Sequence, residues 1–358
     1  MQIVFLIKPF SIHMYSQKEE IFELLGTQEV SVIENETAAD YENRMVYVCK
    51  DICQDFVNTE LFKKQKSAIK NIKVILTNPW CVYEIMDLEK KLDKPEKINQ
   101  KLIDQLIVHK EVENVSILKN SIINISLNGY NVQQVNNQVA EMIHVQYLSI
   151  YGSTNFLSRL KNTLDTIFHL HDIEIDSVYS HINENHRDEK RSENELRIII
   201  EDQGLDLSYT YQNKNVATLF IKSGYLAIKD KIRESLHIDK SILEKILKSK
   251  SLNLNQSSTV TTEKNLTNIW LDLDEMTRKK IDDTLNSELA AIHKEIRNFI
   301  DNIDKELIKK DVNINIYCLD ETIAFTIGYI LGDSIKSDAY IIDTLLTNEG
   351  NIFTKKIF

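Results

Sequence analysis

Glycine and proline are scarce in this chain. Its 358 residues include 8 glycines and 3 prolines, about 3% together, where average usage is about 7% for glycine and about 5% for proline. Glycine supplies the positive-φ and close-approach positions that phosphate-binding loops require. The sequence therefore has little material for glycine-rich nucleotide cradles.

Positive charge and long apolar runs are also lacking. The net charge of −11 at pH 7 argues against a sequence-independent grip on nucleic acid as the main activity. No apolar run approaches the roughly 18 residues of a membrane-spanning helix, and the run at 3–7 is too short for the core of a signal peptide. We therefore expect a cytoplasmic protein with no transmembrane segment and no nucleic-acid partner.

The four cysteines are scattered along the chain, at Cys49, Cys53, Cys81 and Cys318. The spacing of Cys49 and Cys53 is compatible with half of a zinc site, but no second pair follows at ligand spacing. Reduced, buried thiols in a cytosolic protein are the interpretation that we prefer. We expect no metal site.

The rest of the composition is that of a globular protein, with 42% hydrophobic and 27% charged residues. In the first half, apolar runs predict strands at 3–7, 45–49, 73–76, 82–88, 122–127, 139–150 and 173–178. Helical periodicity predicts helices at 51–70, 96–110 and 153–168. Asn128 and Gly129 indicate a turn, and the polar segment 181–195 is predicted to be an exposed loop between two lobes.

The second half begins with three closely spaced strands, predicted at 196–201, 206–211 and 216–221. Further strands are predicted at 312–319 and 339–345. Helices are predicted at 224–235, 239–250, 276–308 and 321–331, and 255–262 is predicted to be a polar loop. The apolar residues of 276–308 recur at three- and four-residue steps, which fits a long helix packed across a sheet or a coiled-coil dimer. Strands followed by helices in both halves predict a mixed α/β architecture.

Five stretches together carry a family resemblance. They are 198–209, which holds a strand, an acidic residue, a glycine and then an aspartate; the helix start 223–226; the helical segment 243–247; and, in the first half, 74–80 and 125–130. This order resembles the actin-like ATPase superfamily, in the branch that contains FtsA and PilM. The first three stretches are similar to its second phosphate stretch, glycine-led helix and adenosine-side motif, and the last two to sections around and inside its inserted subdomain.

The resemblance implies an α/β, two-lobed actin-like (ribonuclease H-like) fold with a small α+β subdomain inserted in the first lobe. The first lobe would comprise 1–81 and, after the inserted subdomain at 82–150, a return at 151–195 that ends in the polar linker. The second lobe would comprise 196–358.

The first phosphate loop of this family would follow strand 3–7 with an acidic residue and a small-residue turn. This chain has Lys8, Pro9, Phe10 and Ser11 there, and proline removes one backbone donor. The second loop keeps a single glycine, Gly204. Beside it, Asp206 is either a group that orients a Mg²⁺-bound water or simply a carboxylate at a strand start.

On the adenosine side, Gly224 and Glu244 stand where the resemblance expects them. The lysine expected three residues after Glu244 is Leu247, and Lys248 is turned by about 100° around the helix. The last nucleotide loop would fall at 320–322, which are two acids and a threonine. Gly204, Asp206, Gly224 and Glu244 thus form a vestigial nucleotide site, and we assign no catalytic residue.

Three other groupings have simpler interpretations than a functional site. His169 and His171 fit a helix end better than a pair of metal ligands. Asp272, Asp274 and Glu275 fit a helix start, where carboxylates suit the helix dipole. The tail 351–358 fits a final docked strand better than a membrane-touching helix, because eight residues are too few for a stable isolated helix.

The resemblance and the missing loops lead to one functional expectation. The chain is expected to be a degenerate actin-like scaffold or adaptor in a bacterial division or type IV pilus-type assembly, without ATP hydrolysis. Its partners would be proteins of a membrane-associated complex, or further copies of itself, with peripheral placement at the inner face of the membrane. No cofactor is expected, and ATP with Mg²⁺ would bind only if the site is retained. The alternatives are a divergent active ATP-binding protein and an unrelated α/β interaction module.

Overall fold

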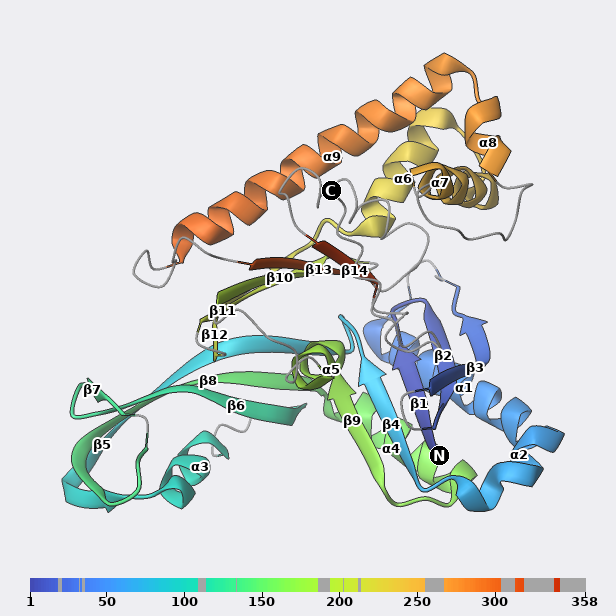
Figure 1. Cartoon of the computed structure of the whole chain (residues 1–358). Coiled ribbons are helices and arrows are strands. Elements are labelled where there is room, and N and C mark those ends of the chain that lie inside the picture. Colours follow the sequence, from blue (N-terminus) through green and yellow to red (C-terminus); the bar gives the residue numbers. More distant parts are fainter. Residues whose placement is uncertain are drawn as a thin grey trace. The chain divides into compact units, whose positions relative to one another are not determined.

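A computed structural model of the whole chain is shown in Figure 1. It describes residues 1–18, 21–31, 33, 36–108, 114–132, 134–185, 194–201, 203–211, 214–254, 267–303, 313–318 and 338–341. The chain divides into two compact units. Unit 1 is Met1–Arg191 with Lys214–Val216, and unit 2 is Ser192–Asn213 with Ala217–Phe358. The domain boundaries given above stay a prediction.

Unit 1 is built on a five-stranded sheet in the order β3-β2-β1-β4-β9. The strands are β1 (Gln2–Ile7), β2 (Ser11–Lys18), β3 (Ile21–Glu29), β4 (Asn71–Leu76) and β9 (Ile173–Ser177). β1, β2 and β3 form an antiparallel meander, while β4 and β9 run parallel to β1. The predicted strands at 3–7, 73–76 and 173–178 are confirmed, and β2 and β3 had not been predicted.

Helices α1 (Ala38–Val57) and α4 (Thr154–Phe168) pack against each other beside this sheet (Figure 1). Phe5 of β1 meets Phe168 of α4 edge to face, with ring centroids 6.4 Å apart. Trp80 stacks on Phe156 at 4.6 Å. Buried aromatic pairs add to the area that they remove from water, so these contacts fix α4 against the sheet.

The strand predicted at 45–49 is wrong, because this segment lies inside α1. The hydroxyl of Thr37 caps the helix by accepting from the amide of Asp40 at 3.1 Å. The buried positions of α1 recur at helical spacing, at Met45, Val46, Cys49, Ile52, Cys53 and Phe56. The predicted helix 51–70 is divided into the end of α1, α2 (Glu60–Gln65) and a short 3-10 helix, η1 (Lys66–Ala68).

Between β4 and α4 the chain forms a four-stranded antiparallel sheet in the order β5-β8-β6-β7. Its strands are β5 (Cys81–Ile98), β6 (Val115–Leu127), β7 (Tyr130–Asn131) and β8 (Gln138–Ser153), and helix α3 (Gln100–Val108) packs on one face. The core between them contains Ile103, Ile107, Ile143, Val145 and Tyr147. The segment predicted to be an inserted α+β subdomain therefore has its own sheet, helix and core.

The predicted exposed loop at 181–195 is wrong at both of its ends. Helix α5 (Val178–Asn185) covers its beginning, and His181 there is buried. Strand β10 (Asn194–Ile200) covers its end, and Glu195 there is buried. Polar composition was misleading because both ends place polar side chains inside the protein.

Unit 2 repeats the architecture of unit 1 with a five-stranded sheet in the order β12-β11-β10-β13-β14. The strands are β10, β11 (Leu205–Tyr211), β12 (Lys214–Ile221), β13 (Asn313–Cys318) and β14 (Asp338–Ile341). β10 and β11 are antiparallel, whereas β10, β13 and β14 are parallel. In each unit, three strands that are consecutive in the chain are thus followed by two strands that run parallel to the first of the three.

The helices of unit 2 are α6 (Tyr225–Leu236), α7 (Lys240–Leu254), α8 (Thr267–Asp272) and α9 (Glu275–Asn302). The apolar stripe of α9 is buried, at Ile281, Leu285, Leu289, Ile292, Ile296 and Phe299. α9 packs against α6, and Lys231 of α6 pairs with Glu288 of α9 at 2.6 Å. The predicted helix start is confirmed for Asp274 and Glu275, since the Asp274 carboxylate accepts from the amide of Thr277 at 2.9 Å. It is wrong for Asp272, which is the last residue of α8.

Several predictions lie outside the described residues. These are the loop 255–262, the helix 321–331, the last nucleotide loop 320–322 and the tail 351–358. In the part of the chain that the structure describes, no helix is long and apolar enough to cross a membrane.

Candidate functional site

The carboxyl ends of the three parallel strands of unit 1 lie side by side. Ile7, Leu76 and Ser177 occupy one row of the sheet, since Ile7 pairs with Leu76 and Leu76 with Ser177. Ligands of open α/β sheets bind preferentially at such an edge. Lys8 and Thr77 follow directly, and both are buried.

The turn after β1, where the resemblance expects the first phosphate loop, is closed by the protein itself. The amide of Lys8 donates to the carbonyl of Ser11 at 2.9 Å, and Pro9 has no amide hydrogen. The indole of Trp80 donates to the Lys8 carbonyl at 3.0 Å, and the hydroxyl of Tyr41 donates to the Pro9 carbonyl. The rings of Tyr41 and Trp80 lie 5.2 Å apart, so two aromatic side chains hold this turn.

Sequence reasoning missed a cluster of buried polar residues at the same edge. It comprises Asp176, Ser177, Ser180 and His181, all at most 5% exposed. The amide of Ser177 donates to the Asp176 carboxylate at 2.8 Å, and the amide of Ser180 donates to the Ser177 hydroxyl at 3.1 Å. An aspartate and a serine at the end of an apolar strand were the signal that could have revealed them.

Asp176 has a perturbed carboxyl group. Burial is the largest influence and raises the pKa of Asp176 above its usual value. The hydrogen bonds from Ser177 and Ser180 and the charges of Lys119 and Lys73 act in the opposite direction and are smaller. The carboxylate is therefore less favourable at this position than in water.

In unit 2, the structure brings Gly204 and Gly224 together. A Cβ built on Gly224 would lie 2.2 Å from the amide nitrogen of Gly204, and one built on Gly204 would lie 2.3 Å from the ring of Phe220. Real Cβ atoms do not approach other atoms so closely, so both positions require glycine. The turn after β10 and the start of α6 are thus in direct backbone contact.

Asp206 lies within β11, opposite Ile199 of β10, and is buried. Directly opposite residues share a face of an antiparallel pair, so Asp206 and Ser208 face the same side as Arg197. The Arg197 guanidinium donates to the Glu195 carboxylate at 2.6 Å, and both side chains are almost fully buried. This face of the sheet in unit 2 is therefore rich in buried polar groups.

Glu244 is on α7, where it forms an ion pair with Lys229 of α6. The Lys229 side chain is buried and that of Glu244 is about half exposed. The pair joins two consecutive helices, which gives Glu244 a partner inside the protein. The use of Gly204, Asp206, Gly224 and Glu244 for a nucleotide stays a prediction.

The cysteines and histidines have local roles. Cys49, Cys53 and Cys81 are buried free thiols, and burial, assisted by Cys49, raises the pKa of Cys53. His169 is the left-handed C-cap of α4, and His171 pairs with Asp165 at 3.0 Å. Among the described residues, no group of three or more His, Cys, Asp or Glu side chains is arranged to hold a metal ion.

No protein-family model matches the chain. No curated protein matches it by sequence. Solved structures do resemble it. The PilM-PilN type IV pilus biogenesis complex aligns with 95% of this chain and 87% of that chain, at 10% identity and a TM-score of 0.59.

Two further solved structures are less similar. MreB 5 of Spiroplasma citri bound to AMPPNP covers 96% of this chain and 92% of its own, at 12% identity and a TM-score of 0.49. The ethanolamine utilization protein EutJ of Carboxydothermus hydrogenoformans covers 98% and 88%, at 8% identity and a TM-score of 0.48. The alignment with the PilM-PilN complex, at 10% identity, is a similarity of fold. It confirms the expected actin-like fold.

Proposed function

We propose that this chain, which has the actin-like fold, is a scaffold or adaptor of a membrane-associated bacterial assembly and does not hydrolyse ATP. Its activity is the binding of protein partners. A type IV pilus-type machine is favoured over a division complex, because the similar solved structure is a complex of PilM with PilN.

The observation that carries the proposal is the closed turn after β1. A phosphate site needs backbone amides that face the ligand. At this turn the Lys8 amide is used by Ser11, Pro9 has no donor, and Tyr41 and Trp80 bind the two carbonyls. Such a turn is poorly suited to cradle a phosphate.

The vestigial positions of unit 2 fit the same proposal. Gly224 is explained by its contact with the backbone of Gln203 and Gly204, and Gly204 by the ring of Phe220 and the carbonyl of Ile221 in β12. Glu244 is explained by its ion pair with Lys229. Three of the four residues that the resemblance assigns to nucleotide therefore have a structural reason in this protein.

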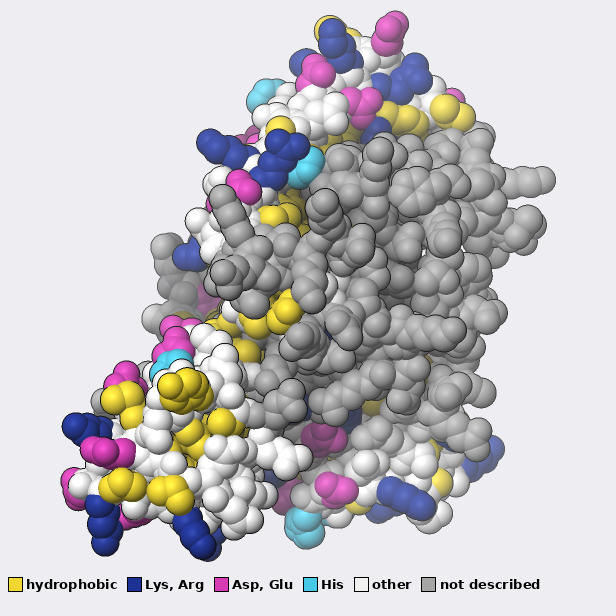
Figure 2. Space-filling view, turned by 60° about the vertical axis from the view of Figure 1, so that its left-hand side comes forward, with side chains coloured by type: hydrophobic (Ala, Val, Ile, Leu, Met, Phe, Trp, Pro, Cys, Tyr) yellow, Lys and Arg dark blue, Asp and Glu magenta, His cyan; other side chains and the backbone are white. Residues whose placement is uncertain are grey.

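The four-stranded sheet offers a surface for a partner. Val139 and Met142 are exposed there at 55% and 39%. Tyr130, which the register places on the other face of the sheet with Leu127 and Ile143, is exposed at 77%. The Asn128 side chain accepts from the amides of Glu141 and Met142, which ties the turn beside Tyr130 to Met142. Figure 2 shows hydrophobic side chains on the part of unit 1 that contains this sheet, at the lower left. Exposed apolar residues of this kind favour a protein contact.

Co-purification from bacterial membranes tests the proposal. The full chain is expected to retain a component of a pilus-type or division assembly, identified by mass spectrometry. The variant Val139→Asp with Met142→Asp is expected to lose that component, since a buried, unpaired charge opposes association. Leu271→Asp changes a residue that is 54% exposed on α8 of unit 2 and serves as the matched control. The proposal would be contradicted if neither the wild type nor the Leu271→Asp control retained such a component.

A further inference from the structure

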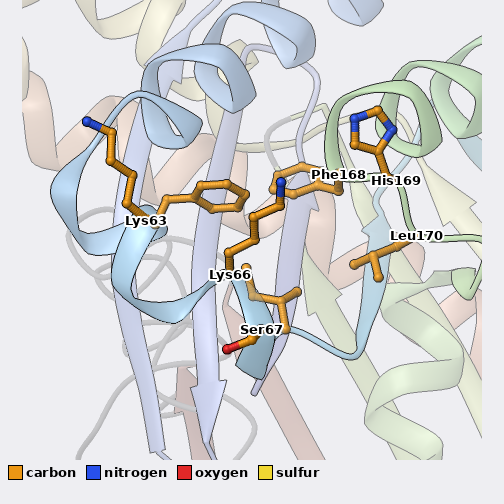
Figure 3. A pocket seen from close by; sticks show the side chains of 8 residues that line it. Lys63, Lys66, Ser67, Phe168, His169 and Leu170 are labelled. Atoms are coloured by element: carbon orange, nitrogen blue, oxygen red, sulfur yellow. The ribbon is translucent and has the colours of Figure 1, made fainter.

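A second concave feature of unit 1 lies at the opposite end of the sheet from the candidate site. It is a cavity of about 490 Å³ lined by residues of α2, η1 and the end of α4 (Figure 3). Residues 66–69 precede β4 and residues 168–170 precede β9, so the cavity is at the amino ends of these parallel strands. Its volume is in the range of ligand-binding pockets, about 300–1,000 Å³.

The floor of the cavity is apolar. Phe62, Ile69 and Phe168 are buried residues that line it, and Leu170 adds a half-buried side chain. Phe62 and Phe168 meet edge to face with ring centroids 6.0 Å apart, and Phe168 is held in turn by Phe5. The floor is therefore rigid and able to accept an apolar group.

The rim of the cavity carries nitrogen-bearing side chains, from Lys63, Lys66 and His169 (Figure 3). No carboxylate is among the lining residues, although the chain has a net charge of −11. Lys63 contacts Glu60 at 2.7 Å, but both side chains are mostly exposed, and such pairs are weak. Lys66 forms no ion pair with any described residue. The cavity thus combines an apolar floor with a locally cationic rim.

We propose that this cavity binds an acidic peptide segment of a partner protein, with one large apolar side chain on the floor and neighbouring carboxylates near Lys63 and Lys66. Charge complementarity supports this occupant: ammonium groups bind carboxylates as charge-assisted pairs, and an apolar side chain gains by leaving water. Nucleic acid is disfavoured, since a few cations on a chain of net charge −11 supply little backbone attraction. The site is independent of the partner surface at Val139 and Met142.

Binding of labelled peptides tests the inference. The probes are fluorescein-labelled peptides in which leucine, phenylalanine or tryptophan is flanked by two glutamates on each side, and fluorescence anisotropy is measured with the full chain. We expect saturable binding of at least one probe, weakened by added salt. Lysine-flanked peptides and a peptide with serine at the centre are expected not to bind. Equal binding of these controls, or no binding of any acidic probe at millimolar concentration, would overturn the inference.

Charge reversal locates the site. Lys66→Glu is expected to weaken binding about tenfold, because it replaces an attraction by a repulsion. Lys64→Glu is the matched control, since Lys64 is exposed on the adjoining helix α2 and does not line the cavity. Equal loss from both variants would show a diffuse charge effect and contradict a defined pocket.

A second measurement does not depend on the variants. With methyl-labelled protein, the acidic probe is expected to shift the NMR signals of Ile69 and Leu170, which line the cavity. Leu24 and Ile242, which are exposed elsewhere, are expected to keep their signals. Shifts at other methyl groups, without shifts at Ile69 and Leu170, would place the peptide elsewhere and overturn the inference.

Discussion

At the residue scale, the two glycines of unit 2 show what the resemblance could and could not predict. Gly204 and Gly224 were singled out because an actin-like nucleotide site needs glycine at those points. In the structure, Gly224 is explained by its contact with the backbone of Gln203 and Gly204, and Gly204 by the ring of Phe220 and the carbonyl of Ile221. Sequence alone could predict that glycine matters there, but not what it contacts, because the contact joins segments twenty residues apart.

Gly224→Ala is expected to destabilise the protein by about 1–3 kcal/mol, since its Cβ would lie 2.2 Å from the Gly204 amide nitrogen and force a backbone shift. Chemical denaturation followed by circular dichroism measures the change. Gly26→Ala is the control, because its Cβ would lie 3.4 Å from Ile52, an ordinary contact. Equal stability of the two variants would show that the close approach is absent in solution.

Asp176→Asn is expected to raise the melting temperature at pH 7. Burial raises the pKa of Asp176, so the protonated carboxyl group favours the folded state at low pH. This stabilisation is lost as the pH rises through the folded-state pKa. Asparagine keeps an oxygen that can accept from Ser177 without the buried charge. The advantage of the variant should therefore shrink as the pH falls toward 4, and an advantage that grows on acidification would refute this explanation.

At the element scale, helix α1 shows why some elements escaped prediction. The short run at 45–49 has the apolar character of a strand, but its buried residues continue through Ile52 and Phe56 at helical spacing. The helix start was missed because Thr37 follows an unremarkable polar segment. By contrast, α9 was predicted well, since its apolar stripe is long and its N-cap Asp274 directly precedes it.

Thr37→Ala is expected to destabilise unit 1 by about 1 kcal/mol, because the Asp40 amide loses its capping hydroxyl. Thr37→Ser should retain most of the stability, since serine is an equally good cap. The denaturant concentrations at the unfolding midpoints of the two variants show whether residue 37 caps the helix or is only an exposed position. A serine variant as unstable as the alanine variant would argue against capping.

Asp274→Ala is expected to lower the stability of unit 2 at pH 7. Hydrogen bonds from the side chain and amide of Thr277 lower the pKa of Asp274, so its stabilisation is present above the usual carboxyl pKa. It is lost as the pH falls through the lowered value. Melting curves of wild type and variant should therefore converge in strong acid, whereas a difference independent of pH would mean that the carboxylate is not the stabilising form.

At the scale of the whole molecule, the two five-stranded sheets share one strand order, which the sequence did not predict because β2 and β3 were missed. The buried strands β10 and β11, with clear punctuation between them, were found directly. The burial of Asp176, Ser177 and His181 was not predicted, because polar residues are usually exposed and His181 lies in a polar segment that was predicted to be a loop. The scarcity of glycine now has a specific meaning, because the turn after β1 is closed by Tyr41 and Trp80 rather than by glycine amides.

The most direct test of the central claim is the melting temperature of the purified chain with and without millimolar ATP and Mg²⁺. A ligand at about 100 times its dissociation constant would stabilise the folded state by about 2.7 kcal/mol. We predict no change, because the turn after β1 offers no phosphate cradle. A reproducible increase that requires both ATP and Mg²⁺ and is abolished by EDTA would contradict the proposal and identify an active nucleotide-binding protein.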